Sequence, residues 1–188
     1  NMDVVFINPN SSAKAYQELA VTYSAIEPPT WALLLAQACR SNNFEVSILD
    51  SDAEKLSPQD SLQRIDELKP RLICFVVYGQ NPNSGTVNMS GATVLANAVK
   101  EAGIKTPICF VGSHVSALPI QVMDKEPSID IVLCNEGVYS LRNLLKTDID
   151  DSEGLAQIKG IGYRKNGRPV LTASEKIVPQ ERMDIDLP

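Results

Sequence analysis

The chain has 188 residues, of which 44% are hydrophobic and 21% are charged, and its formal net charge is −6. This balance is typical of an ordinary globular protein with one good core and a small addition. The negative charge argues against nucleic acid and against an anionic membrane surface as partners, because both attract a basic face. No apolar run approaches the ~20 residues of a membrane span, and no signal peptide is visible at the start.

The cysteines do not indicate a metal site or a disulfide framework. Cys39, Cys74, Cys109 and Cys134 lie far apart in the sequence, and no C-x-x-C pair or zinc-type spacing occurs. Cys74 and Cys109 fall inside apolar runs, where cysteine is usually a small buried hydrophobic residue. We therefore expect reduced, structural thiols in a cytoplasmic protein, with no protein-held metal.

Strand-like and helix-like segments alternate along the chain. Apolar runs predict strands over residues 3–7, 44–49, 71–77, 107–111 and 129–133. Helical spacing, with its start and stop signals, predicts helices over 31–40, 57–70 and 138–145. A further helix is predicted to begin where a polar loop over 78–86 ends and to run to about residue 102. Five such units predict an α/β fold, a doubly wound parallel sheet of five strands with right-handed crossovers.

The pattern changes after residue 147. Asn166-Gly167 lies between two short strand-like runs, which is a strong signal for a β-hairpin. The segment from residue 174 onward is charged and contains proline, as linkers often do. We therefore expect a Rossmann-like domain over residues 2–147, a β-hairpin appendage over 155–173 and a linker over 174–188.

The carboxyl ends of parallel strands meet at one edge of a sheet, and ligands of open α/β sheets bind there. The loops expected at that edge are rich in Asn, Ser and Gly, which offer neutral hydrogen bonds and let a ligand approach the backbone. The same residues populate ordinary turns, so composition alone leaves both interpretations open. The candidate residues are Asn8, Asn10 and Ser11 after the first strand, Tyr78, Gly79 and Gln80 after the third, Gly112, Ser113, His114, Val115 and Ser116 after the fourth, and Asn135, Glu136 and Gly137 after the fifth.

His114 is the single histidine, and it follows a buried strand. Three roles are open to this residue: a metal ligand, a contact to a bound cofactor or an ordinary loop residue. No G-x-G-x-x-G, P-loop or G-x-S-x-G motif occurs, so a standard dinucleotide site, a phosphate loop and a hydrolytic elbow are not expected. Asp50 and Asp52 follow the second strand, where they would bind a ribose, pair with a cation or cap the next element. Trp31 would stack on a ring system or join the core.

Several segments in the same order resemble one family. Residues 27–36 resemble its P-P-x-G-x-x-x-L-A segment with Trp31 in place of glycine, and residues 44–50 resemble its second strand, which ends in Asp. Residues 111–119 resemble G-G-x-H-x-S-x-x-P with Ser113 in a glycine region, and 129–137 resemble D-x-V-x-x-G-E-G with Asn135 for glycine. Residues 158–167 match I-x-G-I-x-Y-R-x-N-G. The family is the N-terminal cobalamin-binding domain of cobalamin-dependent radical SAM enzymes, of the methyltransferase-like class B.

The resemblance implies a flavodoxin-like sheet with strand order 2-1-3-4-5 and a corrin ring over its carboxyl edge. The dimethylbenzimidazole tail would enter among the loops after the third, fourth and fifth strands, where Gly79, Gly112 and Ser113 leave room. It also implies a longer parent enzyme with S-adenosylmethionine, a 4Fe-4S cluster and a radical SAM barrel in cis. In that parent, cobalamin would carry out methyl transfer or related radical chemistry.

Two departures from related patterns limit what is expected of this chain. Better-known cobalamin domains carry D-x-H-x-x-G after the first strand, with a cobalt-ligating histidine, whereas residues 8–12 read Asn-Pro-Asn-Ser-Ser. His114 is then a tail-side contact or a loop residue rather than the cobalt ligand. The C-x-x-x-C-x-x-C cluster motif is also absent, so the chain alone is expected not to catalyse. A non-enzymatic signalling module and a flavin or nucleotide domain are the alternatives.

Overall fold

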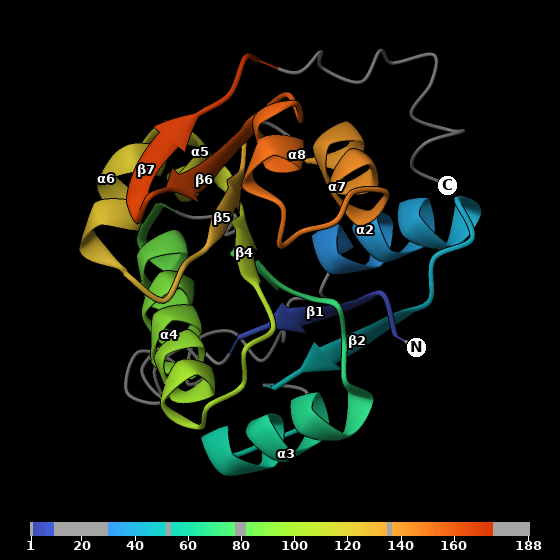
Figure 1. The fold of residues 1–188 in the computed structure, drawn as a ribbon. Coiled ribbons are helices and arrows are strands. Elements are labelled where there is room, and N and C mark those ends of the chain that lie inside the picture. The colour runs from blue at the N-terminus through green and yellow to red at the C-terminus, as the bar shows by residue number, and fades with distance from the viewer. Residues whose placement is uncertain (1, 10–29, 52–53, 78–81, 135–136, 175–188) are drawn as a thin grey trace.

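Strands and helices alternate in the computed structural model, as the apolar periodicity predicts (Figure 1). The structure describes residues 2–9, 30–51, 54–77, 82–134 and 137–174, with side chains for all of these except 30, 31 and 82–88. The strands are β1 (Val4–Asn8), β2 (Val46–Asp50), β3 (Leu72–Val76), β4 (Ile108–Val111), β5 (Ile131–Leu133), β6 (Ile161–Lys165) and β7 (Arg168–Leu171). The helices are α2 (Thr30–Ser41), α3 (Pro58–Leu68), α4 (Pro82–Glu101), α5 (Ser113–Ala117), α6 (Pro119–Lys125), α7 (Val138–Leu145) and α8 (Ser152–Ala156).

The strands form one sheet in the order β2-β1-β3-β4-β5-β6-β7. Strands β1 to β5 are parallel, whereas β6 pairs antiparallel with β5 and β7 antiparallel with β6. The mostly parallel α/β architecture is confirmed, and the sheet has seven strands rather than five, because β6 and β7 continue it beyond β5. The physical reason is the register of Leu133 with Ile161, which gives the backbone groups at the edge of β5 their partners.

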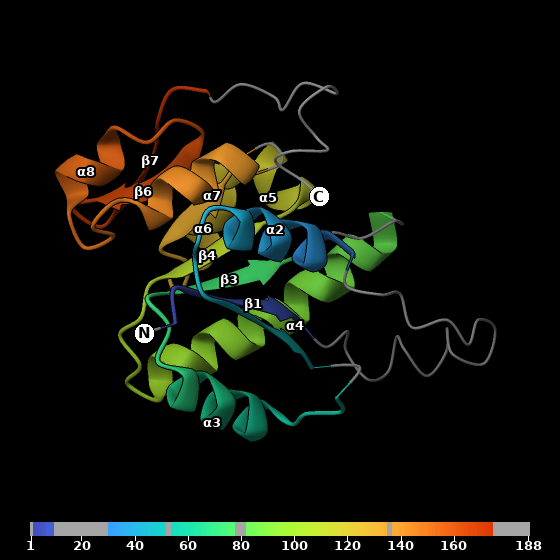
Figure 2. The same cartoon turned by 90° about the vertical axis from the view of Figure 1, so that its right-hand side faces the viewer.

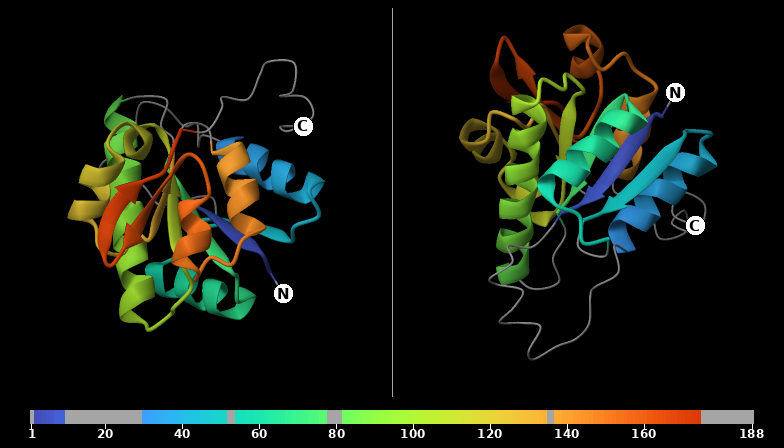
Figure 3. Two further views of the ribbon diagram at one scale, coloured as in Figure 1. Left: turned by 45° about the horizontal axis from the view of Figure 1, so that its top comes forward. Right: turned by 90° about the horizontal axis from the view of Figure 1, so that it is seen from below.

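Side chains that alternate along the strands supply two apolar cores, one on each face of the sheet. Val4 and Phe6 pack on one face beneath α2 and α7, and Val5 and Ile7 pack on the other beneath α3 and α4. Figure 2 shows α2 and α7 on one side of the strands and α3 and α4 on the other. The view from below in Figure 3 shows α3 and α4 in front of the sheet. Strands buried on both faces explain the continuous apolar runs in the sequence.

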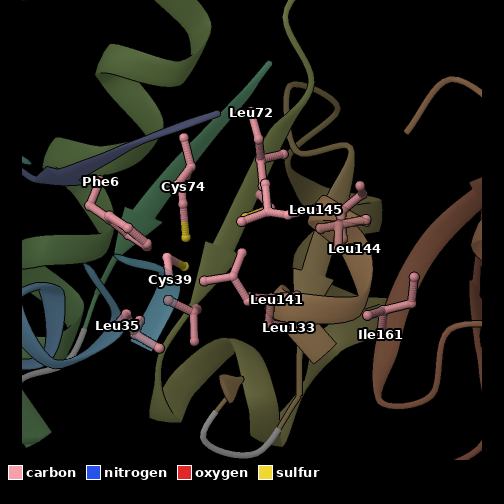
Figure 4. Close-up of a cluster of buried hydrophobic side chains, with 14 of the residues drawn as sticks. Phe6, Leu35, Cys39, Leu72, Cys74, Leu133, Leu141, Leu144, Leu145 and Ile161 are labelled. Atoms are coloured by element: carbon pink, nitrogen blue, oxygen red, sulfur yellow. The ribbon is translucent and has the colours of Figure 1, made fainter. Parts of the chain in front are cut away.

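Three thiols lie in the core beneath α2 and α7. Cys39 of α2 and Cys74 of β3 point toward each other among leucine side chains (Figure 4), and Cys109 lies beside Cys74 on β4. Burial raises the pKa of Cys39 to about 12 and raises the pKa of Cys74 well above its ordinary value. Both thiols stay protonated at neutral pH and serve as packing groups.

The helix boundaries differ from the sequence prediction in three places. Helix α4 begins at Pro82 instead of after Thr86, because proline needs no hydrogen-bond acceptor in the first turn of a helix. Helices α5 and α6 follow β4 where a loop was expected, and α8 was not predicted. By contrast, α3 begins as predicted at a capping box, in which Ser57 Oγ accepts from the Asp60 amide at 3.1 Å.

Arg164 joins β6 to the parallel part of the molecule. Its Nε donates to the Ile129 carbonyl at 3.0 Å, and its Nη2 donates to the carbonyls of Met123 at 2.8 Å and Glu126 at 3.2 Å. Two of these acceptors lie at the end of α6, where a cation is favoured by the helix dipole. The strand pair is therefore fixed to the domain by side-chain as well as backbone bonds. None of the helices that the structure describes has the length and apolarity to cross a membrane.

Candidate functional site

The carboxyl ends of the parallel strands lie along one edge of the sheet. The register pairs Asn8 of β1 with Asp50 of β2, Val76 of β3 with Val111 of β4, and Val111 with Leu133 of β5. The crossover helices begin at this edge and run back toward the other one, so the site candidates that the structure describes, from Asn8 through Gly112 to Gly137, lie along it.

Gly112 makes the ends of β3 and β4 pack backbone against backbone. The Val77 amide donates to the Val111 carbonyl at 2.9 Å, which extends the pairing one residue beyond β3. A Cβ at Gly112 would lie 2.8 Å from the carbonyl oxygen of Val77 and 2.8 Å from its Cγ2. Since a backbone carbonyl cannot move aside as a flexible side chain can, only glycine fits this contact.

Gly137 closes the same edge on the other side of β4. It precedes α7 with a left-handed φ of +79°, a conformation that favours glycine. A Cβ there would lie 3.0 Å from Val111 Cγ2 and 3.4 Å from Leu133 Cδ1. Gly112 and Gly137 therefore let the backbone on either side of the end of β4 pack closely against Val77, Val111 and Leu133.

The segment after β4, predicted as a loop, is the single-turn helix α5. Ser113 and His114 are exposed on it, whereas Val115 is completely buried in the core on the α4 face. The Ser116 hydroxyl, which is partly buried, lies 3.4 Å from the Leu133 carbonyl at the end of β5. The burial of Val115 fixes which side of α5 faces outward, and that side carries Ser113 and His114.

Leu118 at this edge was missed as a site candidate, and Asp50 was considered without being assigned to the site. Leu118 is 44% exposed and lies four residues after His114, whose carbonyl accepts from the Leu118 amide at 3.2 Å. Asp50, for which the sequence left several roles open, is buried at the end of β2 beside Asn8. The position of Asp50 just after an alternating strand was the available signal, but its burial depends on tertiary packing.

The remaining candidates lie outside the described residues. They are Asn10, Ser11, Tyr78, Gly79, Gln80, Asn135 and Glu136, together with the side chain of Trp31. Within the described ranges, no group of three or more His, Cys, Asp or Glu side chains is arranged to hold a metal ion.

The described loop candidates carry amide, hydroxyl and imidazole groups and no carboxylate or ammonium. They are Asn8, Gly112, Ser113, His114, Ser116 and Gly137. Such a set forms neutral hydrogen bonds to a ligand and does not neutralise a phosphate by itself. These described residues therefore suit a ligand that is held by neutral hydrogen bonds.

Two relatives match the chain over most of its length. An anaerobic magnesium-protoporphyrin IX monomethyl ester cyclase from Cereibacter sphaeroides is 24% identical over 177 residues, which are 92% of this chain and 27% of that protein. An uncharacterized methyltransferase from Pyrococcus horikoshii is 26% identical over 141 residues, which are 75% of this chain and 29% of that protein. The chain thus spans less than a third of the length of these relatives.

Two solved structures share the fold. The radical S-adenosylmethionine methyltransferase TsrM from Kitasatospora setae, with tryptophan and a SAM analogue bound, matches with a TM-score of 0.69 and 18% identity over 92% of this chain and 30% of that one. The cobalamin-dependent S-adenosylmethionine radical enzyme OxsB, with aqua-cobalamin and S-adenosylmethionine bound, matches with a TM-score of 0.73 and 16% identity over 100% of this chain and 24% of that one.

A family model ties the sheet and its glycine-lined edge to one domain type. The model of the B12 binding domain matches residues 17–145, which is more than half of the chain and runs through the crossover units from α2 to α7. The protein is therefore a member of the B12 binding domain family.

Proposed function

We propose that the chain is the cobalamin-binding module of a longer radical SAM enzyme, in which it positions the corrin for methyl transfer or related radical chemistry. The observation that carries the proposal is the match to the B12 binding domain over a parallel sheet whose carboxyl edge is closely packed at Gly112 and Gly137. The fold shared with two radical SAM proteins supports the parent class.

The residues of the edge fit a corrin. When bound, cobalamin supplies a cobalt centre that carries a methyl group or an electron, and the chain binds and orients it. We assign contacts with the ring or its nucleotide tail to Asn8, Gly112, Ser113, His114, Ser116 and Gly137, and to the candidates outside the described residues. Val115 contributes by anchoring α5, because its side chain is buried.

We propose that no side chain of this module ligates cobalt. Residues 8–12 contain no histidine, and His114 lies on α5, which follows β4 rather than β1. His114 then contacts the tail.

The rest of the parent protein is part of the proposal, because the chain covers only 24–30% of the proteins compared above. We propose a flavodoxin-like cobalamin domain over residues 2–147, an edge hairpin over 155–173, and a linker over 174–188 toward a radical SAM barrel in cis. S-adenosylmethionine and a 4Fe-4S cluster would belong to that barrel. We propose a cytoplasmic location, with neither nucleic acid nor membrane as a partner.

The proposal is tested with the purified chain and hydroxocobalamin. After mixing and desalting, the corrin absorbance should elute with the protein, and the spectrum of the reduced cob(II)alamin complex should be that of the form without benzimidazole on cobalt. Gly112→Val, which places a branched side chain at the edge, should lose the corrin, and Gly103→Ala, at an exposed turn, should keep it.

Elution of all the corrin in the small-molecule fraction, at protein concentrations at which the chain is folded, would refute the proposal. Retention of FMN or a nucleotide in its place would favour the alternative, a flavodoxin-like signalling or nucleotide-binding module.

A further inference from the structure

Asp50 is the single charged residue that is buried among the residues described, with 8% of its surface exposed. The other buried polar residues in that part of the chain are serines. Buried carboxylates are rare in proteins and, when they occur in a cleft, often belong to a functional site. The proposed function gives Asp50 no role.

The register and the alternation of side chains place Asp50 on one face of the sheet. It is the last residue of β2, paired with Asn8 at the end of β1, so it lies at the carboxyl edge. Val46 and Ile48 pack on the core beneath α2, and Leu49 packs on the opposite core. Asp50 therefore lies on the α2 face, and Asn8, which follows Phe6 by two residues, lies on the same face beside it.

Ser51, the next residue, makes its hydrogen bonds away from the face on which Asp50 lies. Ser51 lies on the other face, where its hydroxyl is 3.4 Å from the hydroxyl of Ser61 on α3, and its amide donates to the Asn8 carbonyl at 3.2 Å. This serine pair holds β2 to α3 and the edge of β2 to β1. Asp50 and Asn8 are thus two neighbouring hydrogen-bonding side chains on the α2 side of the carboxyl edge.

We propose that Asp50, together with Asn8, reads a peripheral carboxamide of the corrin and makes the site specific for amidated corrins over corrin acids. The inference rests on the proposed function. The rim of cobalamin carries primary carboxamides, whose N–H groups donate to a carboxylate. A carboxylate accepts several hydrogen bonds through its two oxygens, so one carboxylate can accept from a protein group and from a ligand together.

Specificity follows from charge. A corrin acid that presents a carboxylate in place of that carboxamide would bring two like charges together at a partly dry site, where screening by water is weak. Asn8 has no charge and tolerates either group. Asp50 is therefore the residue that discriminates against the acid.

The experiment compares the binding of cobalamin and its b-, d- and e-monocarboxylic acids, in each of which one propionamide is a carboxylate. The wild-type chain should bind one of the three isomers roughly tenfold or more weakly than cobalamin, because the acid of that isomer faces Asp50. Asp50→Asn should make the Kd of that isomer about equal to the Kd of cobalamin. For the other two isomers, the ratio of their Kd to that of cobalamin should stay unchanged. The matched control, Ser51→Ala, removes a buried hydroxyl at the adjacent position and should keep the wild-type ratios.

The isomer-specific change separates this role from a structural one and from the overall negative charge, since both would act on all three acids alike. Equal effects of Asp50→Asn on cobalamin and on every acid would overturn the inference while the proposed function stands. Absence of cobalamin binding to the wild type would instead refute the proposed function. If Asp50→Asn does not fold, Asn8→Asp provides the second test, because an added carboxylate should strengthen the discrimination against the same isomer, and an unchanged ratio would contradict the inference.

Discussion

At the scale of single residues, Gly112 is indicated by the sequence as a loop residue and is also required by the tertiary packing. Glycine after a buried strand indicates a ligand loop, and the structure adds that any side chain there meets the Val77 carbonyl. The contact is between backbones, so it cannot be relieved by a rotamer change.

We predict that Gly112→Ala lowers the free energy of unfolding by about 1–3 kcal/mol, because the methyl group forces the ends of β3 and β4 apart. Urea unfolding followed by circular dichroism measures the change. Gly103→Ala is the control, because its Cβ would meet no atom within 4 Å and the only cost there is the left-handed φ of +81°, about 1 kcal/mol. Equal losses in the two variants would contradict the close contact.

The buried thiols predict how stability depends on pH. An ordinary thiol, as in the unfolded chain, loses its proton near pH 9.0, whereas the pKa of Cys39 is about 12 in the folded protein. Between these values the unfolded state binds fewer protons than the folded one, so stability falls as pH rises, by about 1.4 kcal/mol per pH unit for each such thiol. Denaturant unfolding between pH 8 and pH 10.5 should show this fall.

Cys39→Ala removes one of the thiols whose pKa is raised, so the stability of the variant should decrease less steeply over the same pH range. The comparison uses the slope against pH, since the substitution also leaves a cavity that lowers stability at every pH. Parallel slopes for the variant and the wild type would show that the thiol does not titrate as described.

At the scale of elements, Arg164 determines how firmly β6 is held. We predict that Arg164→Ala destabilises the protein by about 1.5–3 kcal/mol, because three carbonyl oxygens lose a charged donor. Chemical unfolding measures this loss. The control is Arg168→Ala, at an exposed position on β7, whose free energy of unfolding should stay within about 0.5 kcal/mol of the wild type. A loss no greater than that of the control would mean that strand pairing alone fixes β6.

The elements that the sequence predicted are those with strong local signals. The run from Leu72 to Val76 is apolar throughout and is a strand buried on both faces, and Ser57-Pro58 begins α3. Helix α5 was missed because Gly112 and Ser113 are typical loop residues and the turn is held by the burial of Val115, a tertiary contact. The pairing of β5 with β6 was missed because it joins residues about thirty positions apart through the edge of the sheet.

At the site, the sequence indicated which loops converge but not how they are used. Gly112, Ser113, His114 and Gly137 lie at one edge because the strand order is that of a parallel crossover sheet. The burial of Asp50 and the exposure of Leu118 depend on the packing of α2, α5 and α6, which no local pattern encodes.

At the scale of the whole molecule, ligand binding is coupled to folding. A ligand that binds only the folded chain stabilises it by about 2.7 kcal/mol when its free concentration is 100 times Kd. We predict such a rise with hydroxocobalamin in thermal or urea unfolding. Cobinamide, which lacks the nucleotide tail, should bind more weakly and so give a smaller rise at the same concentration, if the loops after β3, β4 and β5 hold the tail. Equal stabilisation by both would place the binding energy in the ring alone.

The antiparallel end of the sheet has a consequence for the protein as it leaves the ribosome. From β4 onward, each strand is laid beside the one made just before it, so the sheet widens in the direction of synthesis. Until residues 161–165 emerge from the ribosome, β5 is an apolar edge strand with unpaired backbone amides. A strand of a neighbouring nascent chain can pair with such an edge. Translation products that stop before residue 161 should therefore self-associate, and chains that run through β7 should not.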